Sequence, residues 1–106
     1  MMLNSRRKNV RIFKDLVNLT ENEISLYDDN GNIVTLEPCP LRCEDIDINE
    51  NVGIIIQDQL HAKLLGIPLN NAVIVKSSGS GRDGVTVSRL SCLSDGYSVI
   101  LSPNSF

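Results

Sequence analysis

The chain has few aromatic side chains with which to build a core. Its 106 residues include no tryptophan, and its four aromatic residues are Phe13, Tyr27, Tyr97 and Phe106. The core must therefore be aliphatic, and the isoleucine, leucine and valine residues that dominate it are branched side chains that suit strands. A chain of roughly 100 residues can bury enough surface to fold alone, so we expect one domain.

Long apolar runs are also missing. The longest apolar window, Val52–Ile56, is interrupted by Gly53 and falls far short of the roughly 20 residues that cross a bilayer. The first residues, MMLNSRRKNVRIFK, are basic but lack the apolar segment and the small-residue cleavage site of a signal peptide. We expect a cytoplasmic protein with no membrane partner.

Cysteine and histidine are few. An odd number of cysteines, three, argues against a disulfide framework and for a reducing compartment. With His61, the residues Cys39, Cys43 and Cys92 form a numerical Cys3His set, but only one close pair exists where structural zinc sites usually have two. Free thiols that pack as small apolar groups explain these cysteines better, so we expect no metal.

The same scarcity bears on catalysis. His61 is the only histidine, and neither a nucleophile elbow nor a catalytic cysteine context accompanies it. The carboxylates of Glu44, Asp45, Asp47 and Glu50 do not follow the spacing of a calcium loop, and a solvated acidic edge accounts for them. We therefore expect a protein that is not an enzyme, with no catalytic residues and no cofactor.

The segment 17–40, VNLTENEISLYDDNGNIVTLEPCP, predicts a β-hairpin. A two-residue Asn30-Gly31 turn would place Leu26 opposite Thr35 and split the apolar residues between the two faces. A three-residue loop, Asp29-Asn30-Gly31, with Gly31 in the left-handed conformation, instead places Leu26 opposite Val34. The same register pairs Ile24 with Leu36, Tyr27 with Ile33 and Ser25 with Thr35. Because it makes one face wholly apolar, we predict the three-residue loop.

The remaining pattern predicts an all-β fold. Expected strands cover 11–19, an acidic edge strand at 45–48, the buried strand 52–56, the central strand 72–76, and two closing strands at 85–93 and 97–101 joined through an Asp95-Gly96 turn. Residues 57–65 fit either a short helix or a strand, and Gly66-Ile67-Pro68 predicts a turn. Seven to eight short antiparallel strands with at most one short helix are typical of a small sandwich or barrel.

Charge is distributed unevenly along the chain. The first fourteen residues contain five basic residues and no acidic one, whereas the whole chain has a net charge of −3. We expect residues 1–10 to form a flexible basic arm and residues 11–106 to form the β domain. Nucleic acid is a possible partner through Arg6, Arg7, Lys8 and Arg11. A solvated leader, or an arm that lies on the acidic body of a second copy, are the alternatives.

The segment 77–84, SSGSGRDG, is the best candidate for ligand contact. We expect it to be a loop whose glycines expose backbone donors and whose Arg82 forks onto an anion. It lacks the lysine and the following helix of a P-loop, and a plain flexible connection is the alternative. The predicted ligand-binding residues are Ser78, Ser80, Gly81, Arg82, Asp83 and Gly84.

One part of the chain resembles a known family. The segment Val17-Asn18-Leu19-Thr20, with Tyr27-Asp28 and Gly31 after it, is similar to the opening V-N-L-T-P-H of a family of small phage and prophage proteins. Gly66-Ile67-Pro68 and the strand that begins at Val73 resemble that family's later turn and strand. Glu21 and Asn22 stand in place of the family's proline and histidine, so no role of that histidine carries over.

The resemblance implies a phage origin and an intracellular setting in an infected bacterium. Small phage proteins of this kind are often accessory binders, some of which counteract host defence. We therefore expect a homo-oligomeric, non-enzymatic binding protein whose partner is a host protein or a small phosphorylated ligand such as a nucleotide signal. The alternative is a structural component of the virion or of its assembly.

Overall fold

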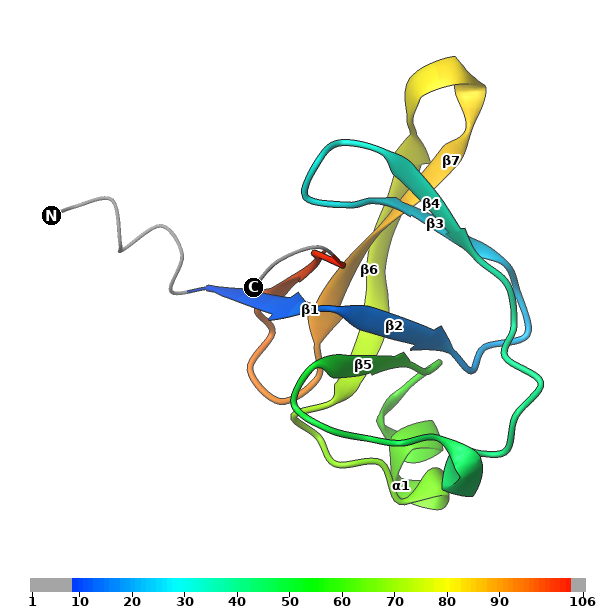
Figure 1. The fold of residues 1–106 in the computed structure, drawn as a ribbon, viewed down its shortest axis with the longest axis vertical. Coiled ribbons are helices and arrows are strands. Elements are labelled where there is room, and N and C mark those ends of the chain that lie inside the picture. Colours follow the sequence, from blue (N-terminus) through cyan, green and yellow to red (C-terminus); the bar gives the residue numbers. More distant parts are fainter. Residues whose placement is uncertain (1–8, 104–106) are drawn as a thin grey trace, which may run out of the picture.

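The computed structural model describes residues 9–103 and is mostly β (Figure 1). Its strands are β1 (Val10–Phe13), β2 (Asp15–Asn18), β3 (Ile24–Tyr27), β4 (Ile33–Leu36), β5 (Val52–Ile55), β6 (Ala72–Ser80), β7 (Thr86–Cys92) and β8 (Ser98–Leu101). One α-helix, α1 (Gln59–Leu65), and two short 3-10 turns, η2 (Cys43–Asp45) and η3 (Arg82–Gly84), join them. The expected all-β class with one short helix is confirmed.

The larger sheet is nearly closed into a barrel. Its strand order is β1-β8-β7-β6-β5-β2, and β3 and β4 form a separate two-stranded sheet. β1 and β2 lie at opposite edges of this order although only Lys14 separates them in the chain. One segment therefore pairs with β8 through its first half and with β5 through its second half. This double pairing links the two ends of the strand order through one continuous segment.

The register of the β3–β4 hairpin is confirmed. Ile24 pairs with Leu36 and Leu26 with Val34. Gly31 has a φ of 80°, as the three-residue loop requires. The carboxylate of Asp28 accepts hydrogen bonds from the backbone N–H groups of residues 30 and 32, each 2.9 Å long, which closes the loop.

The expectation of antiparallel pairing throughout is corrected. β3–β4, β6–β7 and β7–β8 are antiparallel, but β1–β8, β2–β5 and β5–β6 are parallel. Parallel neighbours need a crossover connection. The β3–β4 hairpin and the loop after it supply the connection between β2 and β5, and α1 supplies the one between β5 and β6. The third parallel pair, β1–β8, is connected by the elements from β2 to β7.

Two expected elements differ from the structure. No strand forms at 45–48: the turn η2 ends at Asp45, and Ile46 and Ile48 pack against the core from an irregular loop. The expected loop at 77–84 is also wrong in its first half, because β6 continues to Ser80 and pairs with β7. Glycine and serine have low strand propensity, but cross-strand pairing overrides it here.

The helix α1 settles the ambiguity at 57–65. Asp58 caps its N-terminus, and the Asp58 carboxylate accepts a 2.8 Å hydrogen bond from the backbone N–H of His61. Gly66 ends the helix in the left-handed conformation, with a φ of 71°. No helix in residues 9–103 is long and apolar enough to span a membrane.

Two apolar clusters lie on the two faces of β5. The first lies between the large sheet and the β3–β4 hairpin, and Phe13 is its only aromatic member; it consists of Phe13, Leu16, Ile24, Leu26, Ile55, Val73, Leu90, Cys92 and Leu101. The second lies under α1 and consists of Val52, Ile54, Ile56, Ala62, Ile67 and Ala72. Because both faces of β5 are covered, the absence of polar residues from its sequence is explained.

A buried asparagine attaches the hairpin to the sheet. Asn18, 2% exposed, donates through Nδ2 to the carbonyl oxygens of Asn22 (2.7 Å) and Leu36 (3.0 Å). Its Oδ1 accepts hydrogen bonds from the backbone N–H and the hydroxyl of Thr20. The asparagine and threonine of the VNLT segment are therefore structural, since they fix the base of the hairpin.

Candidate ligand-binding groove

The six predicted ligand-binding residues lie together at the free end of the β6–β7 hairpin. Ser78 and Ser80 are among the last residues of β6. Gly81 follows them, and Arg82, Asp83 and Gly84 form η3. Asp83 and Gly84 have positive φ values of 59° and 75°, which reverse the chain direction.

Arg82 is occupied by the neighbouring hairpin. Its backbone N–H donates to the Tyr27 hydroxyl at 2.9 Å, and its guanidinium donates to the carbonyl oxygen of Gly31. The guanidinium carbon also lies 5.5 Å from the centroid of the Tyr27 ring, which is cation–π distance. We call Tyr27, Gly31 and Arg82 the hairpin clamp, because they join the tips of the two hairpins.

Gly81 completes the clamp through its lack of a side chain. A Cβ at this position would lie 2.8 Å from the Tyr27 hydroxyl oxygen and 2.9 Å from Cγ1 of Val87. Real Cβ atoms almost never come so close to another heavy atom. The close approach of Tyr27 to β6 therefore requires glycine at this position.

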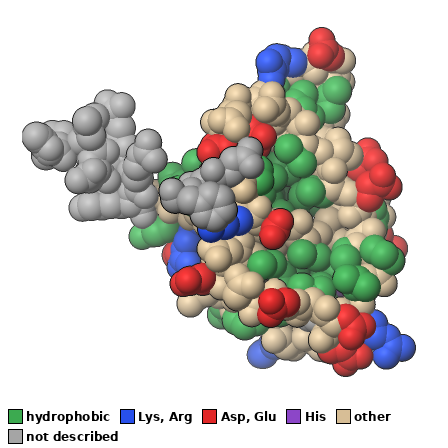
Figure 2. Space-filling view, viewed as in Figure 1, with side chains coloured by type: hydrophobic (Ala, Val, Ile, Leu, Met, Phe, Trp, Pro, Cys, Tyr) green, Lys and Arg blue, Asp and Glu red, His purple; other side chains and the backbone are tan. Residues whose placement is uncertain are grey.

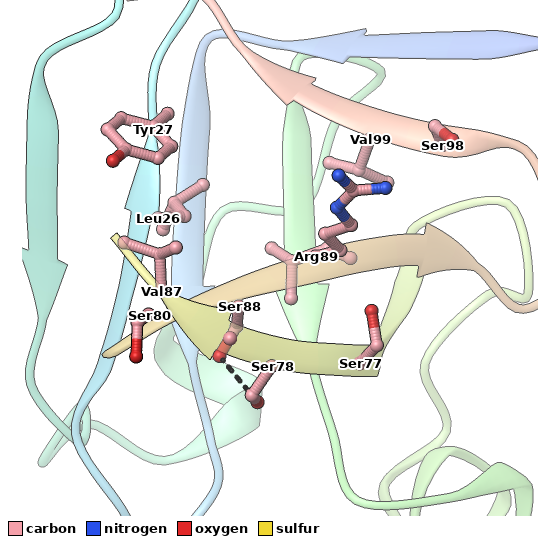
Figure 3. A pocket seen from close by; sticks show the side chains of 12 residues that line it. Leu26, Tyr27, Ser77, Ser78, Ser80, Val87, Ser88, Arg89, Ser98 and Val99 are labelled. Carbon is pink, nitrogen blue, oxygen red and sulfur yellow. Dashed lines mark hydrogen bonds between the residues drawn. The ribbon is translucent and has the colours of Figure 1, made fainter. Parts of the chain in front are cut away.

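A groove of about 640 Å³ lies beside the clamp. Four strands, β3, β6, β7 and β8, contribute its walls (Figure 3). Its lining consists of Leu26, Tyr27, Ser77, Ser78, Gly79, Ser80, Val87, Ser88, Arg89, Leu90, Ser98 and Val99. This volume lies within the range of about 300–1,000 Å³ that small-molecule sites occupy.

The β6–β7 register decides which residues share a face of the groove. Ser77 pairs with Arg89, and Gly79 pairs with Val87, so all four lie on one face of the ribbon. Figure 3 shows Val87 and Arg89 extending toward the side of Tyr27 and Val99. Ser78 and Ser88 extend the other way, where their hydroxyl oxygens lie 3.5 Å apart.

Arg89 is the charged residue of the groove. The lining contains no aspartate or glutamate, and within residues 9–103 the side chain of Arg89 has no hydrogen-bond or ion-pair partner. Its guanidinium therefore keeps its donors available next to serine hydroxyls. A group with these properties suits an anion, because arginine can bind two oxygens of a phosphate or carboxylate at once.

The predicted site and the groove overlap only in part. Ser78 and Ser80 line the groove, whereas Gly81, Arg82, Asp83 and Gly84 lie outside its lining. Sequence reasoning missed Tyr27 and Arg89. A strand at 77–80 that pairs with residues 86–89 would place Arg89 opposite Ser77. The prediction of a loop at 77–84 excludes that pairing.

Cys39, Cys92 and His61 lie outside the lining of the groove. Burial, with a contribution from the negative charge of Asp95, raises the pKa of Cys92 to about 11, so its thiol is protonated at neutral pH. The ring Nδ1 of His61 accepts a 3.2 Å hydrogen bond from the backbone N–H of Gln57 beside α1. The side chain of Cys43 lies outside the described part of the chain, and no metal-binding group of three His, Cys, Asp or Glu occurs among the described residues.

The basic arm is described only in part. Arg6, Arg7 and Lys8 lie outside the described residues. Arg11 belongs to β1, and its Nη2 and Nε donate to the carboxylate of Asp95 at 3.0 and 3.1 Å. The backbone N–H of Tyr97 and this guanidinium hold the pKa of Asp95 below its usual value. Arg11 is therefore engaged within the fold.

Acidic side chains are dispersed over the body. Figure 2 shows aspartate and glutamate at several separate places on one face, with apolar patches between them. The four carboxylates of the loop before β5, Glu44, Asp45, Asp47 and Glu50, are all exposed.

Comparison of the chain with protein-family models, curated proteins and solved structures finds no match. The resemblance of the VNLT segment to phage proteins therefore stays a prediction.

Proposed function

We propose that this protein is a non-enzymatic binding protein that holds a small phosphorylated ligand in the groove. The observation that supports the proposal is Arg89, whose guanidinium lies in a groove without acidic residues and has no partner within residues 9–103. An unpaired arginine beside hydroxyl groups matches the oxygens of a phosphate. Ser77, its cross-strand partner, offers a hydroxyl on the same face.

The composition of the groove supports binding without turnover. Its lining contains no histidine, cysteine, aspartate or glutamate. These are the side chains that most often act as a general base or activate a nucleophile, and the hydroxyl of the tyrosine in the lining, Tyr27, already accepts a hydrogen bond from the Arg82 N–H. The guanidinium of Arg89 contributes charge and hydrogen-bond donors to the groove.

The biological part of the proposal follows from the sequence. The VNLT segment supports a phage origin and action in the cytoplasm of an infected bacterium. A binder of phosphorylated ligands would serve a phage by withholding a nucleotide signal from host defence. The alternative partner, a host defence protein, would contact the same face if the groove accepted one of its anionic side chains.

The test compares two exposed cations on the same hairpin. We expect native mass spectrometry and titration calorimetry to show binding of AMP or inorganic pyrophosphate, and Arg89→Ala to weaken it by about tenfold or more. Lys76→Ala is the control, because Lys76 is exposed on β6 but lies outside the lining. Equal binding by Arg89→Ala and the unmodified protein, or no binding of either probe, would contradict the proposal.

A component of the virion or its assembly is the second candidate, and one observation favours it. Leu60 and Leu64 on α1 are 63% and 76% exposed, and Leu69 after the helix is 45% exposed. Clustered apolar side chains of this kind often mark contacts between copies. This candidate predicts that the protein is found in purified particles and that Leu64→Lys dissociates its oligomers. A monomer that is absent from particles would remove it.

A further inference from the structure

We infer that the phosphorylated ligand is a nucleotide whose base lies over Gly79 against Tyr27 while its phosphate binds Arg89. This inference rests on the proposed function, because it assumes that the groove holds a phosphorylated ligand. It adds the chemical class of the rest of the ligand and its orientation along β6 and β7. Three features of the groove carry it.

The first feature is the glycine in the floor. Gly79 has no positive φ, and a Cβ built at this position would have no heavy atom within 4 Å. The fold therefore gives no reason for glycine here, although glycine weakens a strand interior. Its lack of a side chain leaves an open surface next to Val87, its cross-strand partner. A flat group can lie on such a surface.

The second feature is the rigid aromatic wall. Tyr27 lines the groove. The backbone N–H of Arg82 donates to its hydroxyl, and the Arg82 guanidinium lies over its ring. Leu26 and Val87 add apolar surface beside it. An aromatic ring in a fixed position next to apolar side chains suits a purine or pyrimidine, since base–aromatic stacking accepts every base.

The third feature is the spacing between the wall and the cation. The Gly79–Val87 pair and the Ser77–Arg89 pair are two residues apart along the strands, which corresponds to about 7 Å. One sugar unit fills such a separation between a base and its 5′ phosphate. The hydroxyls of Ser77 and Ser98, which can donate and accept, line this end of the groove. A sugar phosphate alone would leave the glycine floor and Tyr27 without a contact.

The decisive experiment changes the floor without changing the cation. Titration calorimetry would compare AMP, GMP and UMP with ribose 5-phosphate and pyrophosphate, and we expect nucleotides to bind at least about tenfold more tightly than ribose 5-phosphate. Gly79→Val should cost nucleotides about tenfold or more and leave pyrophosphate binding unchanged. Gly79→Ala, a smaller change, should have the same effect in weaker form.

Thr86→Val is the control for a valine on this hairpin. It places valine at a position outside the lining by exchanging the threonine hydroxyl for a methyl group, so nucleotide binding should stay as it was. If ribose 5-phosphate binds as tightly as AMP, or if Gly79→Val binds AMP normally, the nucleotide assignment is wrong while the phosphate site remains. If no phosphorylated probe binds, or Arg89→Ala changes nothing, the proposed function fails as well.

Discussion

The two arginines of the β6–β7 hairpin have opposite surroundings. Arg82, at the tip, bonds the Gly31 carbonyl through its guanidinium and lies over the Tyr27 ring. Arg89, in the strand that follows, faces a groove and has no partner within residues 9–103. Both side chains are exposed, so exposure does not separate them. What separates them is whether the hydrogen-bond donors of the guanidinium are already used.

This difference divides the hairpin into a structural end and a binding end. The hairpin clamp fixes the tip, and Tyr27 belongs to both ends because its ring also lines the groove. A cation whose contacts are all internal stabilises the fold, whereas a cation without partners is free to bind an anion. Variants on either side of this division should therefore affect stability and binding separately.

The largest expected difference lies between Gly81 and Gly79, which are two residues apart. Gly81→Ala places a Cβ 2.8 Å from the Tyr27 hydroxyl oxygen and 3.1 Å from the Val85 carbonyl oxygen. We expect it to lower the free energy of unfolding by about 1–3 kcal/mol. Gly79→Ala meets open space and should raise the free energy of unfolding by up to about 0.5–1 kcal/mol. Urea unfolding measures both, and equal changes would contradict the division.

The second difference lies between the arginines themselves. Arg82→Ala removes the hydrogen bond to Gly31 and the contact with the Tyr27 ring, so we expect a loss of about 1 kcal/mol in the free energy of unfolding. Arg89→Ala removes no side-chain hydrogen bond or ion pair with the described residues and should stay within about 0.5 kcal/mol of the unmodified protein. Chemical denaturation checks both values. Greater destabilisation by Arg89→Ala would show that Arg89 is the structural arginine.

Local chemistry made the β3–β4 hairpin predictable. Its turn needs one residue with positive φ, which Gly31 supplies, and only one register places Leu26 and Val34 on the same apolar face. The buried strand at β5 and the turn at Gly66 were predictable for similar reasons, since each depends on residues next to one another in the chain.

Long-range pairing was not predictable in this way. Nothing in the residues of β1 shows that it pairs with β8 in parallel, because that contact joins the two ends of the described chain. The candidate site failed for a related reason. Serine and glycine predict a loop from Ser77 onward, yet pairing with β7 makes Ser77–Ser80 a strand and turns Arg89 toward the groove. The sequence alone therefore favoured Arg82, the arginine in the glycine-rich turn.

The smallest expected effect separates the two functions of Tyr27. Tyr27→Phe removes the hydroxyl that accepts the Arg82 N–H, and at this exposed position water can replace it, so the loss of unfolding free energy should be about 0.5 kcal/mol. The ring remains, so nucleotide affinity should stay within about twofold if stacking on the ring provides the contact. Tyr27→Leu keeps an apolar side chain but removes the ring, and calorimetry should then show a loss of about tenfold in nucleotide affinity. A loss of that size in Tyr27→Phe would mean that the hydroxyl, and with it the hairpin clamp, governs binding, and the division of the hairpin into two ends would not hold.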